Sequence, residues 1–239
     1  MVNRKTALLI RRSHRYLGLF LGIQFLLWTI SGLYFSWTNL DNIHGDQFKN
    51  MNYEAPPFGG LNRPLPMGSS AGIRSIELRD IGGKPFYWIN NQTLINAIDH
   101  SPKEGITREE ALYIAEKRMN SGLVVSGIER IEQVNKHHEY REKLLPAYVI
   151  SYEGKENLKA YVSIDDGKFQ TVRHRDWRTF DFLWMTHTMD YEGRDNFNTL
   201  VLRIFSLMGL ITVLSGFTLW FVSSPRVRRV MSKYHQRKG

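Results

Sequence analysis

In this sequence of 239 residues, histidine is the residue type that could most readily bind a metal or take part in catalysis. The chain holds eight histidines and no cysteine. An imidazole can ligate a metal or act as an acid or base near neutral pH, whereas the lack of cysteine excludes disulfides, Cys-ligated zinc, iron–sulfur clusters and thiol catalysis. The sequence also contains no G-x-S-x-G, H-E-x-x-H, P-loop or dinucleotide-binding motif. We therefore expect no catalytic nucleophile, and any chemistry depends on where the histidines lie.

Two of the histidines stand beside long apolar segments. His14 comes just before an uncharged run over 16–37, and His187 comes before a second apolar run over 200–222. At about 1.5 Å per residue, either run is long enough to cross the hydrocarbon core of a bilayer. Buried core helices are the alternative, but aromatic residues near the ends of the runs favour membrane spans. We predict two transmembrane helices, with His14 and His187 at opposite membrane faces, about 30 Å apart.

Basic residues without acidic neighbours flank both predicted spans on one side. Residues 1–15 and 223–239 contain eleven Lys and Arg but neither Asp nor Glu, whereas residues 38–199 carry a net charge of −3, so the tails are the source of the chain's net charge of +9. The positive-inside rule places both tails in the cytoplasm and residues 38–199 outside, which is the periplasm for a bacterial inner membrane. The first span is followed by no cleavage site and is expected to remain as an anchor. Because the net positive charge comes from the tails, it gives no support for a nucleic-acid partner.

The region between the predicted spans has the pattern of a small α+β domain. A polar linker with several Pro and Gly covers 38–72, and the domain follows over 73–172. Thr107 and Glu110 form a T-x-x-E capping box at the start of a helix. Strands are expected on both sides of this helix, at about 73–78, 86–89, 94–98, 127–135, 146–153, 158–164 and 169–172. We predict a helix packed on an antiparallel sheet, and an aromatic segment over 173–199 on the outer interface of the bilayer.

The order of several motifs resembles the PepSY-associated transmembrane family. These are the run Arg11 to Gly22 around His14, the step Ser31-Gly32, the run T-x-x-E-A-x-x-I-A from Thr107, the run I-D-x-G-K from Ile164, His187, and the run S-G-x-x-L-W from Ser215. The resemblance covers most of the chain and implies an α+β membrane protein, in which two transmembrane helices flank an extracytoplasmic PepSY-like domain. Longer relatives have more spans, so this chain resembles a reduced version. Thr188-Met189-Asp190 follows His187 where relatives often show a His-Thr-Gly-like run.

The resemblance implies haem b, because the longer relatives include haem-containing reductases for iron–siderophores. A haem held by two histidines needs neutral imidazoles on opposite sides of one iron. His14 and His187 are expected at opposite membrane faces, so each would ligate its own haem iron and need a second ligand. A homodimer or a partner membrane subunit is the favoured source of that ligand, and His44 and His235 are the candidates within the chain.

Electron transfer across the membrane is the function that this resemblance implies. Arg15 and Arg203 are expected to pair with haem propionates. No flavin or nicotinamide site is recognisable, so electrons would come from an external donor and pass to an extracytoplasmic acceptor such as a ferric chelate. The chain would then be a subunit of a membrane oxidoreductase. Two other functions stay open: a non-enzymatic PepSY module that recruits a partner through its sheet, and an accessory subunit of a larger membrane complex.

Plainer interpretations exist for the histidines. His14 can be one more interfacial cation, and His187 can be a surface residue. His137-His138 falls in a charged run that is typical of a solvated loop, and His100 stands next to a Ser-Pro turn. His174 is expected on an exposed basic face.

Overall fold

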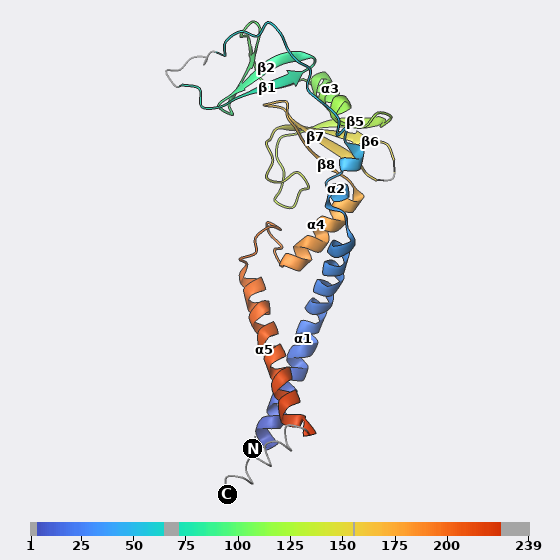
Figure 1. Cartoon of the computed structure of the whole chain (residues 1–239), viewed down its shortest axis with the longest axis vertical. Helices are drawn as coiled ribbons and strands as arrows, with labels where there is room; N and C mark the ends of the chain where they lie inside the picture. Colours follow the sequence, from blue (N-terminus) through green and yellow to red (C-terminus); the bar gives the residue numbers. More distant parts are fainter. Residues whose placement is uncertain (1–3, 65–71, 155, 226–239) are drawn as a thin grey trace. The chain divides into compact units, whose positions relative to one another are not determined.

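The computed structural model describes residues 4–64, 72–154 and 156–225 (Figure 1). The predicted basic tail over 223–239 therefore lies largely outside the described residues, and so does His235. The chain folds as two compact units. The helical unit comprises Met1–Trp37 and Phe182–Gly239, and the α+β unit comprises Thr38–Asp181.

Two long helices dominate the helical unit. They are α1 (Arg4–Trp37) and α5 (Leu200–Ser223), and the last residues of α4 (Arg175–Thr188) belong to the same unit. α1 and α5 pack side by side and run in opposite directions (Figure 1). α1 begins well before the uncharged run because no Pro or Gly interrupts the preceding basic stretch. Thr199 caps the start of α5, because its side chain accepts a hydrogen bond from the Leu202 N–H.

The surfaces of α1 and α5 are apolar and open. Leu19 and Ile23 on α1 are 71% and 69% exposed, and large apolar side chains are exposed along α5 as well. The segments Leu8–Trp37 and Leu200–Phe221 are long and apolar enough to cross a bilayer. A core helix of a soluble protein would bury such side chains, and a water-exposed apolar surface of this extent is unfavourable. The surface therefore contacts lipid, and the chain is a membrane protein, as the sequence predicts.

The α+β unit contains two antiparallel four-stranded sheets, separated in the sequence by α3 (Arg108–Arg118). The strands of the first sheet are β1 (Ile76–Ile81), β2 (Lys84–Ile89), β3 (Thr93–Asn96) and β4 (Pro102–Lys103). Those of the second sheet are β5 (Val125–Ile131), β6 (Ala147–Tyr152), β7 (Lys159–Ser163) and β8 (Phe169–Arg173). The predicted α+β class is confirmed. The expectation of a single sheet is wrong, because the described strands on either side of α3 pair only among themselves.

Both sheets are meanders, and both carry a P-x-Y-x-I motif in the same place. Pro85–Ile89 lies on β2 and Pro146–Ile150 leads into β6, so each motif falls on the second strand of its sheet. The motif tyrosines pair across to Ile95 on β3 and to Val162 on β7. The two sheets therefore have the organisation of two related half-units.

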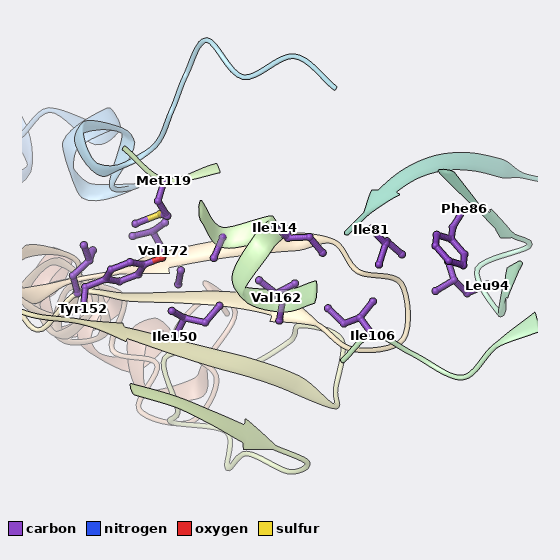
Figure 2. Close-up of a cluster of buried hydrophobic side chains, with 14 of the residues drawn as sticks. Ile81, Phe86, Leu94, Ile106, Ile114, Met119, Ile150, Tyr152, Val162 and Val172 are labelled. Carbon is purple, nitrogen blue, oxygen red and sulfur yellow. The ribbon is translucent and has the colours of Figure 1, made fainter. Parts of the chain in front are cut away.

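The main hydrophobic core lies between α3 and the second sheet (Figure 2). α3 begins at the predicted capping box: the Thr107 side chain accepts the Glu110 N–H, and the Glu110 carboxylate accepts the Thr107 N–H. Ile114 on α3, Val162 on β7 and Ile81 at the end of β1 belong to one buried cluster. The core thus joins the helix to both sheets.

The start of the predicted linker is more ordered than the sequence suggests. It forms α2 (Leu40–Ile43) and a single 3-10 turn, η1 (Asp46–Phe48). The Asn50 N–H donates to the Arg118 carbonyl at 2.9 Å, and the Asn120 N–H donates to the Phe48 carbonyl at 2.9 Å. The first bond satisfies the last carbonyl of α3, which the helix itself leaves unpaired, and the second ties the chain just after α3 to η1.

A charged cluster fixes the start of α4 to the second sheet. The carboxylate of Glu139 accepts the Tyr161 hydroxyl at 2.5 Å and the Arg178 guanidinium at 2.6 Å. Burial opposes the ionisation of Glu139, but these donors outweigh it and hold the pKa of the carboxyl below its usual range. Arg173 lies 3.9 Å from the centroid of the Trp177 ring. The groups satisfy one another, which is the pattern of a structural cluster.

Candidate functional site

Side chains on one stripe of α1 hold the C-terminal end of α4. Trp28 donates its indole N–H to the His187 carbonyl at 2.8 Å, and the Gln24 amide donates to the Thr186 carbonyl at 3.1 Å. The last carbonyls of a helix lack partners within it, and an unpaired carbonyl is costly in lipid. Gln24, Trp28 and Ser31 follow one another at helical spacing. Gln24, the polar residue in the middle of the predicted span, therefore helps to hold the end of α4 against α1.

The imidazole of His187 packs against the same stripe. Its Nδ1 lies 2.7 Å from the Ser31 hydroxyl oxygen. The Phe35 ring meets it edge-on, with 5.5 Å between centroids. Burial lowers the pKa of His187, because it disfavours the charged form. The site therefore favours the neutral imidazole.

His14 has a matching partner on α5. Its Nδ1 lies 2.7 Å from the Ser215 hydroxyl oxygen. A Cβ atom on Gly216 would come within 3.3 Å of the His14 ring, so the missing side chain lets the imidazole approach α5. The Ser-Gly step of α5 thus supplies both the hydrogen-bond partner and the space.

The two histidines are held in a crossed arrangement. His14 lies beside the first span but contacts Ser215 of the second, and His187 precedes the second span but contacts Ser31 of the first. Each serine is followed by glycine. From His14 to Ser31, α1 rises about 25 Å. The two imidazoles therefore occupy different levels along the helix pair.

The hydrogen bonds of the two serines decide which ring nitrogen is free. Ser31 Oγ lies 2.7 Å from the Leu27 carbonyl, and Ser215 Oγ lies 2.7 Å from the Thr212 carbonyl. A carbonyl can only accept, so each hydroxyl donates its hydrogen there and accepts a hydrogen from the imidazole. In the neutral form of each imidazole the ring hydrogen therefore lies on Nδ1, and Nε2 has the lone pair. Metal-binding histidines have this form, with the other nitrogen held by a hydrogen bond.

The structure does not bring the predicted arginines to these imidazoles. Arg15 is exposed, and its guanidinium lies 5.4 Å from the centroid of the Tyr16 ring. Arg203 is exposed in the first turn of α5. The described residues of the helical unit contain no third histidine, and His44 belongs to the α+β unit. A second imidazole for either site would therefore come from outside the described part of this unit.

The turn that follows His187 is built around Asp190. The carboxylate accepts backbone N–H bonds from Asn196 at 2.8 Å, Gly193 at 3.1 Å and Glu192 at 3.2 Å. Burial opposes the charge, but these donors outweigh it and hold the pKa of Asp190 below its usual range. The sequence after His187 therefore returns the chain from α4 to α5.

The serines are the residues that sequence reasoning does not assign to the site. Ser31 and Ser215 stand in Ser-Gly steps that belong to the family motifs, and this is the feature of the sequence that could have pointed to them. The pairing of Ser215 with His14 follows only from the packing of α5 against α1, and that of Ser31 with His187 only from the packing of α4 against α1. Gln24 gives a second signal, because a lone amide in an apolar span needs a partner.

These features define a class of membrane protein in which two antiparallel apolar helices, α1 and α5, flank an α+β unit in the sequence and hold His14 and the His187 of α4 through serine hydroxyls. Within that class, the family described as the PepSY-associated TM region matches residues 2–230, and the chain belongs to it. The resemblance drawn from the sequence motifs is thereby confirmed. Comparisons with curated proteins and with solved structures give no match.

Proposed function

We propose that this PepSY-associated protein is a b-type haem protein of the bacterial inner membrane. It would pass electrons from an external donor to an extracytoplasmic acceptor such as a ferric chelate. In this proposal both termini are cytoplasmic and residues 38–199 are periplasmic, because the basic residues flank the spans on one side. The observation that supports it most directly is that Nδ1 of each imidazole lies 2.7 Å from a serine hydroxyl oxygen, so that Nε2 is the nitrogen left for a ligand.

The residues at both positions fit an axial ligand of haem iron. Haem iron binds neutral imidazole, and a hydrogen bond to the other ring nitrogen orients the ring and raises its basicity. His14 and His187 both have such a hydrogen bond, and burial favours the neutral form of His187. Bound haem would supply one-electron chemistry. The chain itself would hold the two rings, fix their hydrogens on Nδ1 and separate the two positions along the membrane normal.

In this proposal a homodimer or a partner subunit would supply the second histidine ligand of each haem iron. The described helical unit offers one imidazole at each level, whereas a haem held by two histidines needs a pair. Gly18 and Gly22 lie one and two turns along α1 from His14, and a Cβ on either would meet no atom within 4 Å. This G-x-x-x-G spacing allows another helix to approach closely beside His14. Arg15 and Arg203 are exposed and would serve as propionate partners only in such an assembly.

A difference spectrum of the detergent-purified protein, reduced minus oxidised, tests the proposal when haem is quantified per chain. We expect a b-type spectrum that is lost in part in His14→Ala and in part in His187→Ala. His137→Ala is the matched control, because His137 is exposed in a loop of the α+β unit. A chain that takes up no haem, even with haem supplied during expression, would remove the redox function.

A non-enzymatic binding module is the second candidate, and the edge strands favour it. β1 and β5 are edge strands of their sheets, and Ile76, Leu78 and Val125 on them are exposed. Such an edge can pair with a strand of a partner. This function would survive in the His14→Ala and His187→Ala variants, whereas electron transfer would not. An accessory role in a larger complex would instead show as a chain that is monodisperse only with its partner.

A further inference from the structure

His174 lies buried between β8 and α4, and one of its ring nitrogens has no partner. Its side chain is 0% exposed, so the expectation of an exposed basic face is wrong. Nε2 lies 2.9 Å from the Asn42 carbonyl and 3.2 Å from the Ile43 carbonyl. Both are acceptors, so Nε2 carries the hydrogen. Nδ1 is buried and makes no hydrogen bond to any residue that the structure describes, and a buried polar atom of this kind needs an explanation.

Two carboxylates lie beside this histidine. One ligand atom from each of Glu156, His174 and Asp176 lies within 4.8 Å of those of the other two. Glu156 comes from the loop between β6 and β7, and Asp176 comes from the first turn of α4. The Arg175 N–H donates to the Glu156 carbonyl at 2.8 Å, which ties the loop to the start of the helix. Since Nε2 is engaged, Nδ1 is the ring nitrogen that remains for a ligand.

Arg175 is the cation that these carboxylates contact. Its guanidinium lies 3.4 Å from a carboxylate oxygen of Glu156 and 3.4 Å from one of Asp176. Both contacts are long, and the Arg175 side chain is 62% exposed. Exposed ion pairs of this kind contribute little to stability. The guanidinium can therefore leave when another cation binds.

We propose that Glu156, His174 and Asp176 bind one divalent transition-metal ion. A neutral imidazole with two carboxylates is a ligand set that suits Zn²⁺ and similar ions, with water at the remaining position. The hydrogen bonds from Nε2 to backbone carbonyls fix the ring and its tautomer, as they do for metal-binding histidines. Mg²⁺ and Ca²⁺ prefer oxygen ligands throughout, so the imidazole selects against them. The site lies within the α+β unit and does not depend on the proposed haem ligands.

Zn²⁺ titration of the full-length protein, freed of metal by a chelator and held in detergent, tests the proposal. Calorimetry should show a Zn²⁺ site that Glu156→Gln and Asp176→Asn weaken at least tenfold, with unchanged thermal unfolding of the metal-free proteins. Glu132→Gln is the matched control, because Glu132 is likewise a glutamate in contact with an arginine, at 3.1 Å. Zn²⁺ bound at His14 or His187 would be unaffected by these changes, so the difference in binding between the parent and the variants measures the site of Glu156, His174 and Asp176.

Arg175→Ala provides a second test, in which the affinity for Zn²⁺ is expected to rise rather than fall. The variant removes the competing guanidinium but keeps the backbone N–H bond to Glu156, so Zn²⁺ should bind several-fold more tightly. Binding that is the same in the parent, Glu156→Gln and Asp176→Asn would overturn the proposal, and so would weaker binding in Arg175→Ala. Mg²⁺ binding as strong as that of Zn²⁺ would overturn the assigned ion class. None of these results bears on haem binding, which is measured separately by its spectrum.

Discussion

Replacing Ser31 by alanine tests whether serine positions the imidazole as a ligand. The change removes the oxygen that lies 2.7 Å from His187 Nδ1 and leaves the packing of Phe35 in place. The ring N–H then has no acceptor in a half-buried site, which costs about 1–3 kcal/mol. The same hydrogen bond orients the ring that would bind iron, and losing such a support lowers metal affinity by about 10- to 100-fold. The two magnitudes agree, since about 1.4 kcal/mol corresponds to a factor of ten.

Haem titration of the haem-free protein in detergent is the assay, with the spectrum resolved into the contributions of the two positions. We expect weaker binding at the His187 position and unchanged binding at the His14 position. Ser36→Ala is the matched control, because the hydroxyl of Ser36 on the same helix is exposed and donates to the Leu33 carbonyl at 2.8 Å. Ser31→Thr keeps the hydroxyl and should restore most of the affinity.

Equal haem affinity in Ser31→Ala and Ser36→Ala would refute the reasoning. An equal loss at both positions would also refute it, because a positioning hydrogen bond acts on one ring only. Such a loss would mean that the substitution disturbs the packing of α1 and α5 as a whole.

Other parts of the chain give equally direct tests. Trp28→Phe keeps the ring but removes the N–H donor to the end of α4, so the free energy of unfolding measured in detergent should fall by about 1–3 kcal/mol. Burial lowers the pKa of His187 below its ordinary 6.5, so as the pH falls the unfolded chain is protonated at His187 before the folded chain is. The neutral His187 ring therefore contributes fully to the stability of the fold above about pH 6.5, and this contribution declines as the pH falls below that value. Melting temperatures at pH 5.5 and 7.5 should therefore differ less in His187→Gln than in the parent. Gly105→Ala should destabilise the α+β unit by about 1–3 kcal/mol in denaturant titrations, because φ is +77° and a Cβ would lie 2.8 Å from a side-chain carbon. Gly127→Ala, where a Cβ meets open space, should change stability by less than about 0.5 kcal/mol.

Features that depend on neighbouring residues are readable in the sequence. The apolar runs over 16–37 and 200–222 predict the two long helices because a membrane span needs only length and apolar character. The capping box of Thr107 and Glu110 marks the start of α3 because its hydrogen bonds join residues three apart. The strands on either side of α3 follow from short apolar segments bounded by turns. The order of the motifs identifies the family.

Features that depend on distant residues are not readable in this way. The division of the strands into two sheets depends on which strands pair, and the apolar pattern of each strand does not specify its partner. His174 looks like an exposed basic residue because its neighbours are arginines, yet the α2 carbonyls that bury it come from far earlier in the chain.

The candidate site shows the same division most clearly. The sequence alone singles out His14 and His187 as candidates and predicts that they lie at opposite ends of the membrane spans, because their positions relative to the apolar runs are local facts. Their partners Ser215 and Ser31 lie far away in the sequence, so the pairing follows only from the packing of α5 and of the end of α4 against α1. The assignment of the hydrogen to Nδ1 depends in turn on that pairing. Residue types thus limit the chemistry to imidazole, and tertiary packing decides which nitrogen is free, because a hydrogen bond requires two groups within about 3 Å of each other.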